Sequence, residues 1–206
     1  MKNNQGGFTL VEIAIVLVII GLLLGGVLKG QELINSAKVK NFATDFRNIP
    51  LFIYGYQDKY RALPGDDKNA QAHVAATTNG DGNGVIDGNW NASTGESFNF
   101  WQHVRLAGLA AGTTDVGAAD YLPKNADGGQ IGITSGVNSP ITTLKGSYVI
   151  CSGGILGKFA KQLDITMDDG NTATGSMQVI GTGTGGAAAA TADVADAAPF
   201  TVCLAF

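Results

Sequence analysis

The longest apolar run of the chain lies at its N-terminus. Residues 8–28 form a stretch of 21 residues whose only ionisable side chain is that of Glu12, behind a seven-residue leader that carries one charge, Lys2. A helix of this length, at about 1.5 Å per residue, crosses the core of a bilayer. A carboxylate in such a span is costly, so Glu12 is expected to have a cationic partner. The amine that a cut after Gly7 would create is the candidate.

The helical pattern continues beyond the apolar run. Apolar and aromatic residues recur at intervals of three and four, at Val39, Phe42, Phe46, Ile49, Ile53, Tyr56 and Tyr60. This spacing places them on one helix face, which we expect to pack against a globular domain. Pro50 lies off this face and is expected to bend the helix. The helix should end before Leu63-Pro64-Gly65, giving a span of residues 8–62.

The rest of the chain has the pattern of an α+β domain. We expect a loop over residues 66–95, helices over 97–111 and 156–163, and an exposed Gly/Ala/Thr loop over 181–198. The expected strands are residues 130–134, 141–150, 175–182 and 200–206. The predicted fold is therefore a long N-terminal helix, membrane-spanning in its first half and amphipathic in its second, packed on a C-terminal domain with an antiparallel sheet.

Composition and charge exclude some functions. The chain has 206 residues and a formal net charge of −4, without a basic stripe, so nothing indicates nucleic-acid binding. His73 and His103 are isolated, and no HExxH, GxSxG or phosphate-binding GxxxxGK[ST] motif is present. We therefore expect no enzyme activity, and His103 is interpreted as a structural residue.

The junction between leader and apolar run resembles a known signal. Gly7-Phe8-Thr9-Leu10-Val11-Glu12 is similar to the type IV prepilin signal. The resemblance implies that a prepilin peptidase cuts between Gly7 and Phe8 and methylates the new amine, and that Glu12 acts in assembly with Phe8. It also implies a type IV pilin fold and four regions, namely a leader (1–7), a membrane and filament-core helix (8–28), its amphipathic continuation (29–62) and a globular domain (63–206).

Two simpler readings compete with this interpretation. A secretory signal has an apolar core of about 7–15 residues and a small-x-small cut site, whereas this run is longer and Val27-Leu28-Lys29 is a poor site. A plain single-pass anchor would leave both Glu12 and the Gly7-Phe8 junction unexplained. Charge alone, with Lys29 after the span, favours the opposite orientation, but the leader motif is more specific.

The resemblance leads to a structural function. It implies a type IV pilin that waits in the inner membrane as a single-pass precursor and is assembled by dedicated pilus or secretion machinery into a helical homo-oligomeric filament, extracellular or periplasmic. The alternatives are a pseudopilin of type II secretion and a membrane-anchored calcium-dependent adhesin or sensor. Whether the subunit is major or minor, and whether the filament serves adhesion, motility, secretion or electron transfer, stays open.

A polar loop follows the pattern of a calcium site. Residues 79–87, NGDGNGVID, match the first nine positions of an EF-hand loop, with Asn79, Asp81, Asn83 and Asp87 as side-chain ligands and the Val85 carbonyl at position 7. Ile86 is the apolar plug. Position 12 is Trp90 rather than glutamate. A further carboxylate must therefore come from elsewhere: Glu96 is preferred, then Asp66 or Asp67. The alternative is a turn that binds no ion.

Two further features complete the prediction. The globular domain also resembles a group of bacterial prepilin-like proteins. The resemblance rests, in this order, on Leu63-Pro64-Gly65-Asp66, the loop of residues 79–87, Glu96, Trp101-Gln102-His103, Ala107-Gly108-Leu109, Leu163-Asp164, Asp168-Asp169-Gly170 and Gly175. The only cysteines, Cys151 and Cys203, lie 52 residues apart in strand-like segments. In an exported protein such a pair is expected to form a disulfide, as the resemblance also implies, although two buried thiols are the alternative.

Overall fold

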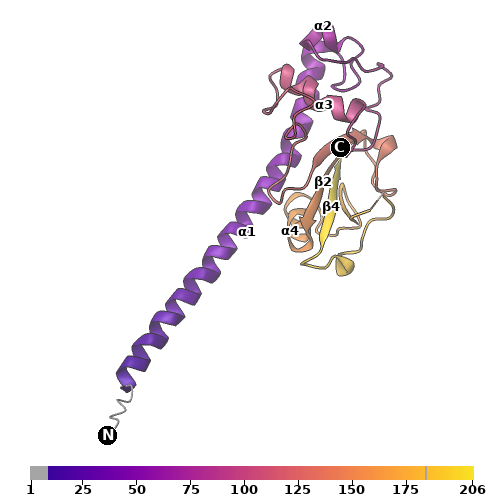
Figure 1. Cartoon of the computed structure of the whole chain (residues 1–206). Helices are drawn as coiled ribbons and strands as arrows, with labels where there is room; N and C mark the ends of the chain where they lie inside the picture. The colour runs from indigo at the N-terminus through magenta and orange to yellow at the C-terminus, as the bar shows by residue number, and fades with distance from the viewer. Residues whose placement is uncertain (1–8, 184) are drawn as a thin grey trace, which may run out of the picture. The chain divides into compact units, whose positions relative to one another are not determined.

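The computed structural model describes residues 9–183 and 185–206, which form an α+β fold. The elements follow in the order α1 (Leu10–Tyr60), α2 (Ala70–Val74), α3 (Glu96–Leu106), β1 (Ile131–Ser135), the 3₁₀ turn η1 (Gly136–Asn138), β2 (Tyr148–Leu156), α4 (Gly157–Met167), β3 (Met177–Gly181), the 3₁₀ turn η2 (Thr191–Asp193) and β4 (Pro199–Ala205) (Figure 1). A long N-terminal helix followed by an antiparallel sheet confirms the predicted fold class and is consistent with a pilin fold.

The chain divides into two compact units, residues 1–38 and 39–206. In its described residues the first unit is helical from Leu10 onward and belongs to α1. Every side chain from Leu10 to Leu28 is exposed in this unit. Such a helix has no core of its own, so another apolar environment is needed to cover it.

The second unit takes its core from the amphipathic part of α1. The predicted face is buried at Val39, Phe42, Phe46, Ile49, Ile53 and Tyr56, each at most 3% exposed. All of these except Tyr56 pack with residues of α3, α4 and the sheet, among them Trp101, Phe159 and Ile150, in one apolar cluster, whereas Tyr56 packs against α2 in a smaller one. Pro50 lies inside the helix and outside this buried face, as predicted.

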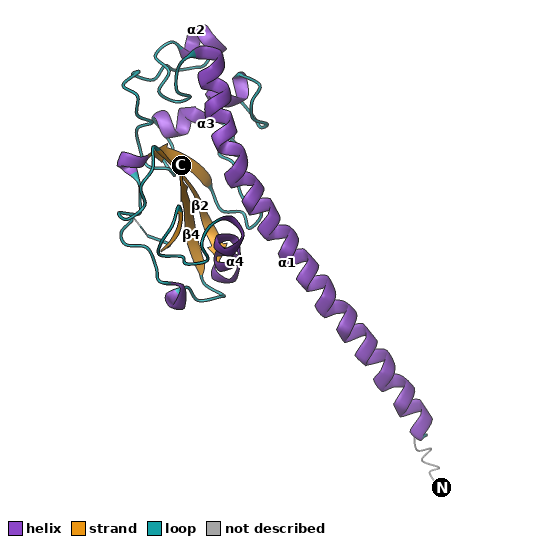
Figure 2. Ribbon diagram, turned by 180° about the vertical axis from the view of Figure 1, so that it is seen from behind, coloured by secondary structure: helices purple, strands orange, loops and turns teal. Residues whose placement is uncertain are grey.

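The sheet has four strands in the order β1-β2-β4-β3, and all neighbours are antiparallel. Ile150 of β2 and Val202 of β4 face the helical core, whereas their neighbours Cys151 and Cys203 face a second cluster on the opposite side. This alternation follows from the two-residue period of a strand. Helix α4 lies beside the strands in both views (Figure 2).

Some predicted boundaries are wrong. Residues 141–147 are not a strand: Ile141 and Leu144 are buried because they cover the second face of the sheet, where Ile141 forms an isolated bridge to Gly186. The predicted loop 66–95 contains α2, and α3 ends at Leu106 rather than 111. The Gly/Ala/Thr segment is largely exposed but includes η2 and the buried Val194.

Candidate functional site

The first candidate site is the start of α1. The backbone amide and hydroxyl of Thr9 donate to Oε2 of Glu12 at 2.8 and 2.7 Å, and the Glu12 amide donates to the Thr9 hydroxyl at 3.3 Å. These reciprocal bonds form a capping box, which satisfies amides that a helix start leaves unpaired. Glu12 is exposed. The predicted cleavage and methylation residues, Gly7 and Phe8, lie outside the described residues.

The helix behind Glu12 is suited to an apolar surrounding. The apolar part of α1 contains no buried residue, and by its length and composition this helix can cross a membrane. Its large side chains are solvent-accessible on all sides; Leu10 is 86% and Leu22 73% exposed. An apolar surface of this extent marks an interaction with lipid or with other protein chains.

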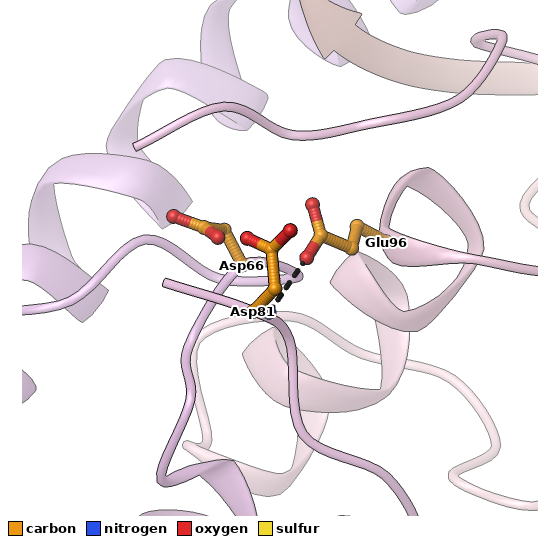
Figure 3. Close-up of side chains that lie close together, drawn as sticks. All are labelled: Asp66, Asp81 and Glu96. Carbon is orange, nitrogen blue, oxygen red and sulfur yellow. Dashed lines mark hydrogen bonds between the residues drawn. The ribbon is translucent and has the colours of Figure 1, made fainter. Parts of the chain in front are cut away.

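The second candidate site is the acidic loop of the globular unit. Asp66, Asp81 and Glu96 bring one carboxylate oxygen each within 4.8 Å of one another (Figure 3). Glu96, at the start of α3, holds both branches of the loop, because its two oxygens accept the amides of Asp81 at 3.0 Å and Asp87 at 2.9 Å. Glu96 was the preferred additional carboxylate in the sequence, and the structure places it beside Asp81.

Asp66 has a larger part in this loop than the sequence indicated. Its carboxylate is 3% exposed and accepts the backbone amides of Gly82, Asn83 and Gly84 at 2.7, 3.0 and 2.8 Å. Gly82 and Gly84 have positive φ, at 75° and 88°, which turns these amides inward at little cost for glycine. Asp66 directly follows Leu63-Pro64-Gly65, which ends the helix. This turn was the only feature of the sequence that indicated where Asp66 lies.

The remaining predicted ligands are placed differently. Asn83 donates from its side chain to Asp81 at 3.0 Å and to Asp87 at 3.2 Å, so these three stay together. Asn79 instead accepts the amide of Gln71 at 2.8 Å. Val85 donates its amide to Asn83 at 2.7 Å, and the Ile86 side chain is fully buried, as expected for the plug.

The electrostatics of this loop favour a cation. Burial raises the pKa of the Asp66 carboxyl, against the loop amides, and the neighbouring Asp81 raises it further. Burial also raises the pKa of Glu96, and the Asp66 and Asp81 carboxylates add to the shift. No ion pair with a lysine, arginine or histidine joins these three carboxylates within residues 9–183 and 185–206. An oxygen-rich site with excess negative charge suits a hard divalent cation.

Asp67, the third alternative ligand, faces away from the loop. Its Oδ2 accepts the Tyr56 hydroxyl at 2.8 Å and lies 2.7 Å from Nδ1 of His73, while Oδ1 accepts the Asn69 amide at 2.8 Å. Burial alone would raise the pKa of Asp67, but these hydrogen bonds outweigh it and lower the pKa. Asp67 therefore links α1 to α2 and is not part of the acidic cluster.

His103 has a structural position. It is fully buried, its Nδ1 accepts the Gly65 amide at 2.9 Å, and Nε2 lies 3.3 Å from the Thr78 carbonyl oxygen. Since Nδ1 is an acceptor here, the proton belongs on Nε2, which donates to Thr78. Burial lowers the pKa of His103, so the ring stays neutral. It fixes the turn that precedes Asp66.

Cys151 of β2 and Cys203 of β4 are opposite each other in the sheet and form a disulfide. Both are fully buried in the second apolar cluster. The bond joins the two central strands and closes a loop of 52 residues.

The fold and the start of α1 are both consistent with one class, the type IV pilin-like proteins. Residues 2–28 match the family model described as the prokaryotic N-terminal methylation motif, the prepilin-type signal of that class. This match supports a type IV pilin-like or pseudopilin precursor, and proteins with the prepilin-type signal are structural subunits rather than enzymes. No curated protein and no solved structure matches the chain.

Proposed function

We propose that this chain is the precursor of a pilin, the structural subunit of a type IV filament. The observation that carries the proposal is the prepilin-type signal at residues 2–28 followed directly by a fully exposed apolar helix whose one charge is Glu12. Processing by prepilin peptidase and assembly into a pilus or secretion filament are implied by the signal. The four regions 1–7, 8–28, 29–62 and 63–206 are the proposed functional divisions.

The proposed mechanism is assembly rather than catalysis. After cleavage at Gly7, residues 8–28 wait in the inner membrane, and an assembly motor outside this chain lifts them into a bundle of like helices. Lipid and the bundle interior are both apolar, so the helix changes surroundings without exposing its surface to water. The N-methylated Phe8 amine of one subunit pairs with Glu12 of its neighbour, which offsets the cost of a carboxylate in an apolar bundle.

The Thr9–Glu12 bonds support this role for Glu12. Among residues 9–183 and 185–206, the hydrogen-bond partner of the Glu12 carboxylate is Thr9, which is neutral. A neutral cap satisfies part of the carboxylate but leaves its charge uncompensated. A neighbour's amine would supply the missing charge, so assembly is favoured over the isolated subunit.

Mass spectrometry of filaments sheared from native host cells tests the proposal. A pilin is expected in the sheared fraction, with an intact mass that starts at N-methylated Phe8. Recovery in a periplasmic filament of a type II secretion system would identify the pseudopilin instead. Recovery only in the membrane fraction, as a monomer, would overturn the filament function and favour an anchored adhesin or sensor.

We also propose that the loop of residues 79–87 binds Ca²⁺ together with Asp66 and Glu96. Asp81, Asn83, Asp87 and the Val85 carbonyl follow the spacing of a calcium loop, and Asp66, Asp81 and Glu96 lie within 4.8 Å of one another. Asn79 would join only if its bond to Gln71 breaks. Calcium would order the loop and cancel the repulsion among the carboxylates. Comparison of thermal melting of the full chain in calcium and in chelator tests this.

A further inference from the structure

A second acidic cluster lies at the C-terminal end of α4, far along the chain from the loop of residues 79–87. Asp164 is in the last turn of α4, and Asp168 directly follows the helix. Asp164, Asp168 and the next residue, Asp169, bring one carboxylate oxygen each within 4.8 Å of one another. The last turn of α4 contains no basic residue. The helix dipole disfavours negative charge at this end, so three carboxylates here need an explanation.

The buried carboxylate of Asp164 lacks a partner for its charge among the described residues. Its side chain is 0% exposed, and within residues 9–183 and 185–206 no donor reaches either carboxylate oxygen in good hydrogen-bond geometry. Burial is the main cause that raises the pKa of Asp164 to about 6; the Asp169 and Asp168 carboxylates contribute to this rise, and the nearby amides of Gly170 and Asn171 oppose it. A buried carboxylate without a partner is strongly destabilising, and such groups are rare in folded proteins.

The other two carboxylates are fixed toward Asp164 by the turn that follows α4. Asp168 accepts the Met177 amide at 2.8 Å and the Ser176 hydroxyl at 3.2 Å. Asp169 accepts the Asn171 amide at 2.8 Å and the Thr174 hydroxyl at 2.8 Å. The turn is thus built around these side chains, and each oxygen keeps a lone pair for a further ligand.

Gly175 shows how tightly the turn closes on Asp168. Its φ is +76°, and a Cβ at this position would collide with the Asp168 carboxylate. Only glycine permits both the conformation and the close approach. The turn therefore holds Asp168 in a defined position before any ligand arrives, which reduces the entropy lost on binding.

We propose that Asp164, Asp168 and Asp169 form a second calcium site. Three carboxylates within 4.8 Å match oxygens placed around Ca²⁺, since two ligands on opposite sides of the ion at about 2.4 Å each are separated by about 4.8 Å. The ion would give the buried Asp164 the partner that it lacks and neutralise the charge at the helix end. The site is separate from the loop of residues 79–87 and does not depend on the filament function.

The test uses the full chain in detergent, stripped of metal with chelator, at pH 7.5. The background is Asp81→Asn, which disables the first loop and leaves the second cluster intact. In this background, 10 mM CaCl₂ should raise the melting midpoint relative to chelator by roughly 4 °C, if the dissociation constant is about 10⁻⁴–10⁻³ M as in extracellular calcium modules. The same concentration of MgCl₂ should give less than half of this shift.

Two further variants in the same background identify the ligands. Asp164→Asn should remove the calcium-dependent shift while raising the midpoint in chelator, because it deletes a buried charge. Asp169→Asn alters an exposed side chain and should also remove most of the shift, so it serves if Asp164→Asn does not fold. Asp120→Asn, at an exposed carboxylate outside both clusters, is the matched control and should keep the full shift.

Three results would overturn the proposal. One is a folded Asp81→Asn chain whose midpoint does not respond to calcium. Another is a calcium shift that survives both Asp164→Asn and Asp169→Asn. The third is an equal shift in magnesium, which would contradict the assignment to calcium.

Discussion

Thr9 donates two hydrogen bonds to a single oxygen of Glu12, at 2.8 and 2.7 Å, at the start of α1. The carboxylate therefore has two possible roles, as a helix cap within one chain and as a charge for a neighbouring chain. Substitutions at these two residues separate the roles, because the cap needs hydrogen-bond acceptors whereas the intermolecular pair needs the negative charge.

The first prediction concerns this charge. Glu12→Gln retains an oxygen that can cap the helix but removes the charge, and we expect processed protein in the membrane with assembly reduced on the order of 100-fold, since losing one partner of a buried ion pair costs about 3 kcal/mol. Thr9→Ala removes the cap alone and should assemble. Immunoblots of sheared and membrane fractions measure both. Normal filament numbers from Glu12→Gln would exclude the ion pair.

The second prediction concerns processing. Gly7→Leu should leave unprocessed precursor in the membrane, because the resemblance implies that the peptidase requires glycine before the cut. N-terminal sequencing and intact mass distinguish a start at Met1 from one at Phe8. A mature start after residue 28 in the parent chain would mean that an ordinary secretory signal is removed instead.

The third prediction concerns the disulfide. Joining Cys151 to Cys203 across 52 residues should stabilise the folded chain by roughly 2–4 kcal/mol in the chain-entropy model. Dithiothreitol should therefore lower the melting midpoint by several degrees. The Cys151→Ser/Cys203→Ser chain is the control and should melt lower with or without the reductant. Two free thiols in denatured, unreduced native protein would show that the bond is not formed in the host.

The fourth prediction ranks the ligands of the first loop. Asp66→Asn and Asp81→Asn should each reduce the calcium-dependent rise in melting midpoint, because both carboxylates lie in the three-residue cluster. Asn79→Ala should retain most of the rise, since Asn79 bonds to Gln71. Trp90 adjoins the loop, and its fluorescence should follow the same titration. If Asn79→Ala removed more of the rise than Asp66→Asn, the ligands would instead follow the spacing of an EF-hand loop, with Asn79 at its first position.

The fifth prediction uses the buried His103. Burial lowers the pKa of His103 in the folded chain. Below pH 6.5 the imidazole therefore binds a proton in the unfolded chain but not in the folded chain, so the contribution of His103 to the free energy of unfolding falls as the pH drops. His103→Gln keeps a donor for Thr78 but does not titrate. The midpoint difference between parent and variant should shrink from pH 7.5 to 5.5. A constant difference would contradict the assignment of a neutral ring. Comparison of the two chains at each pH cancels the contribution of the other titratable groups.

The spacing of apolar residues correctly predicted α1, where the pattern extends over many turns. It failed where tertiary contacts, rather than local pattern, determine the structure. The stripe from Val39 to Tyr56 determined the buried face of α1 because every third or fourth residue meets the same core. Residues 141–147 have strand-like composition, yet Ile141 and Leu144 serve as a cover for the sheet. No local signal separates these two uses of apolar residues, since both bury the side chain.

The candidate sites show the same division. The spacing of the loop of residues 79–87 indicated Asp81, Asn83 and Asp87, which the structure keeps together. The position of Asp66 depends on how the turn after α1 folds back onto the loop, and that requires His103 and Gly65 to meet across 38 residues. Asp164 appears in the sequence as one acidic residue of an amphipathic helix, and only burial distinguishes it.

The position of β4 inside the sheet has a consequence for the order of folding. Its residues, Pro199–Ala205, come after the other three strands in the sequence, yet they pair with both β2 and β3. Until β4 is in place, β3 has no partner among the described strands, and one edge of β2 stays unpaired. The strand that is synthesised last of the four therefore closes the sheet, and an unfinished chain exposes strand edges that can pair with other chains.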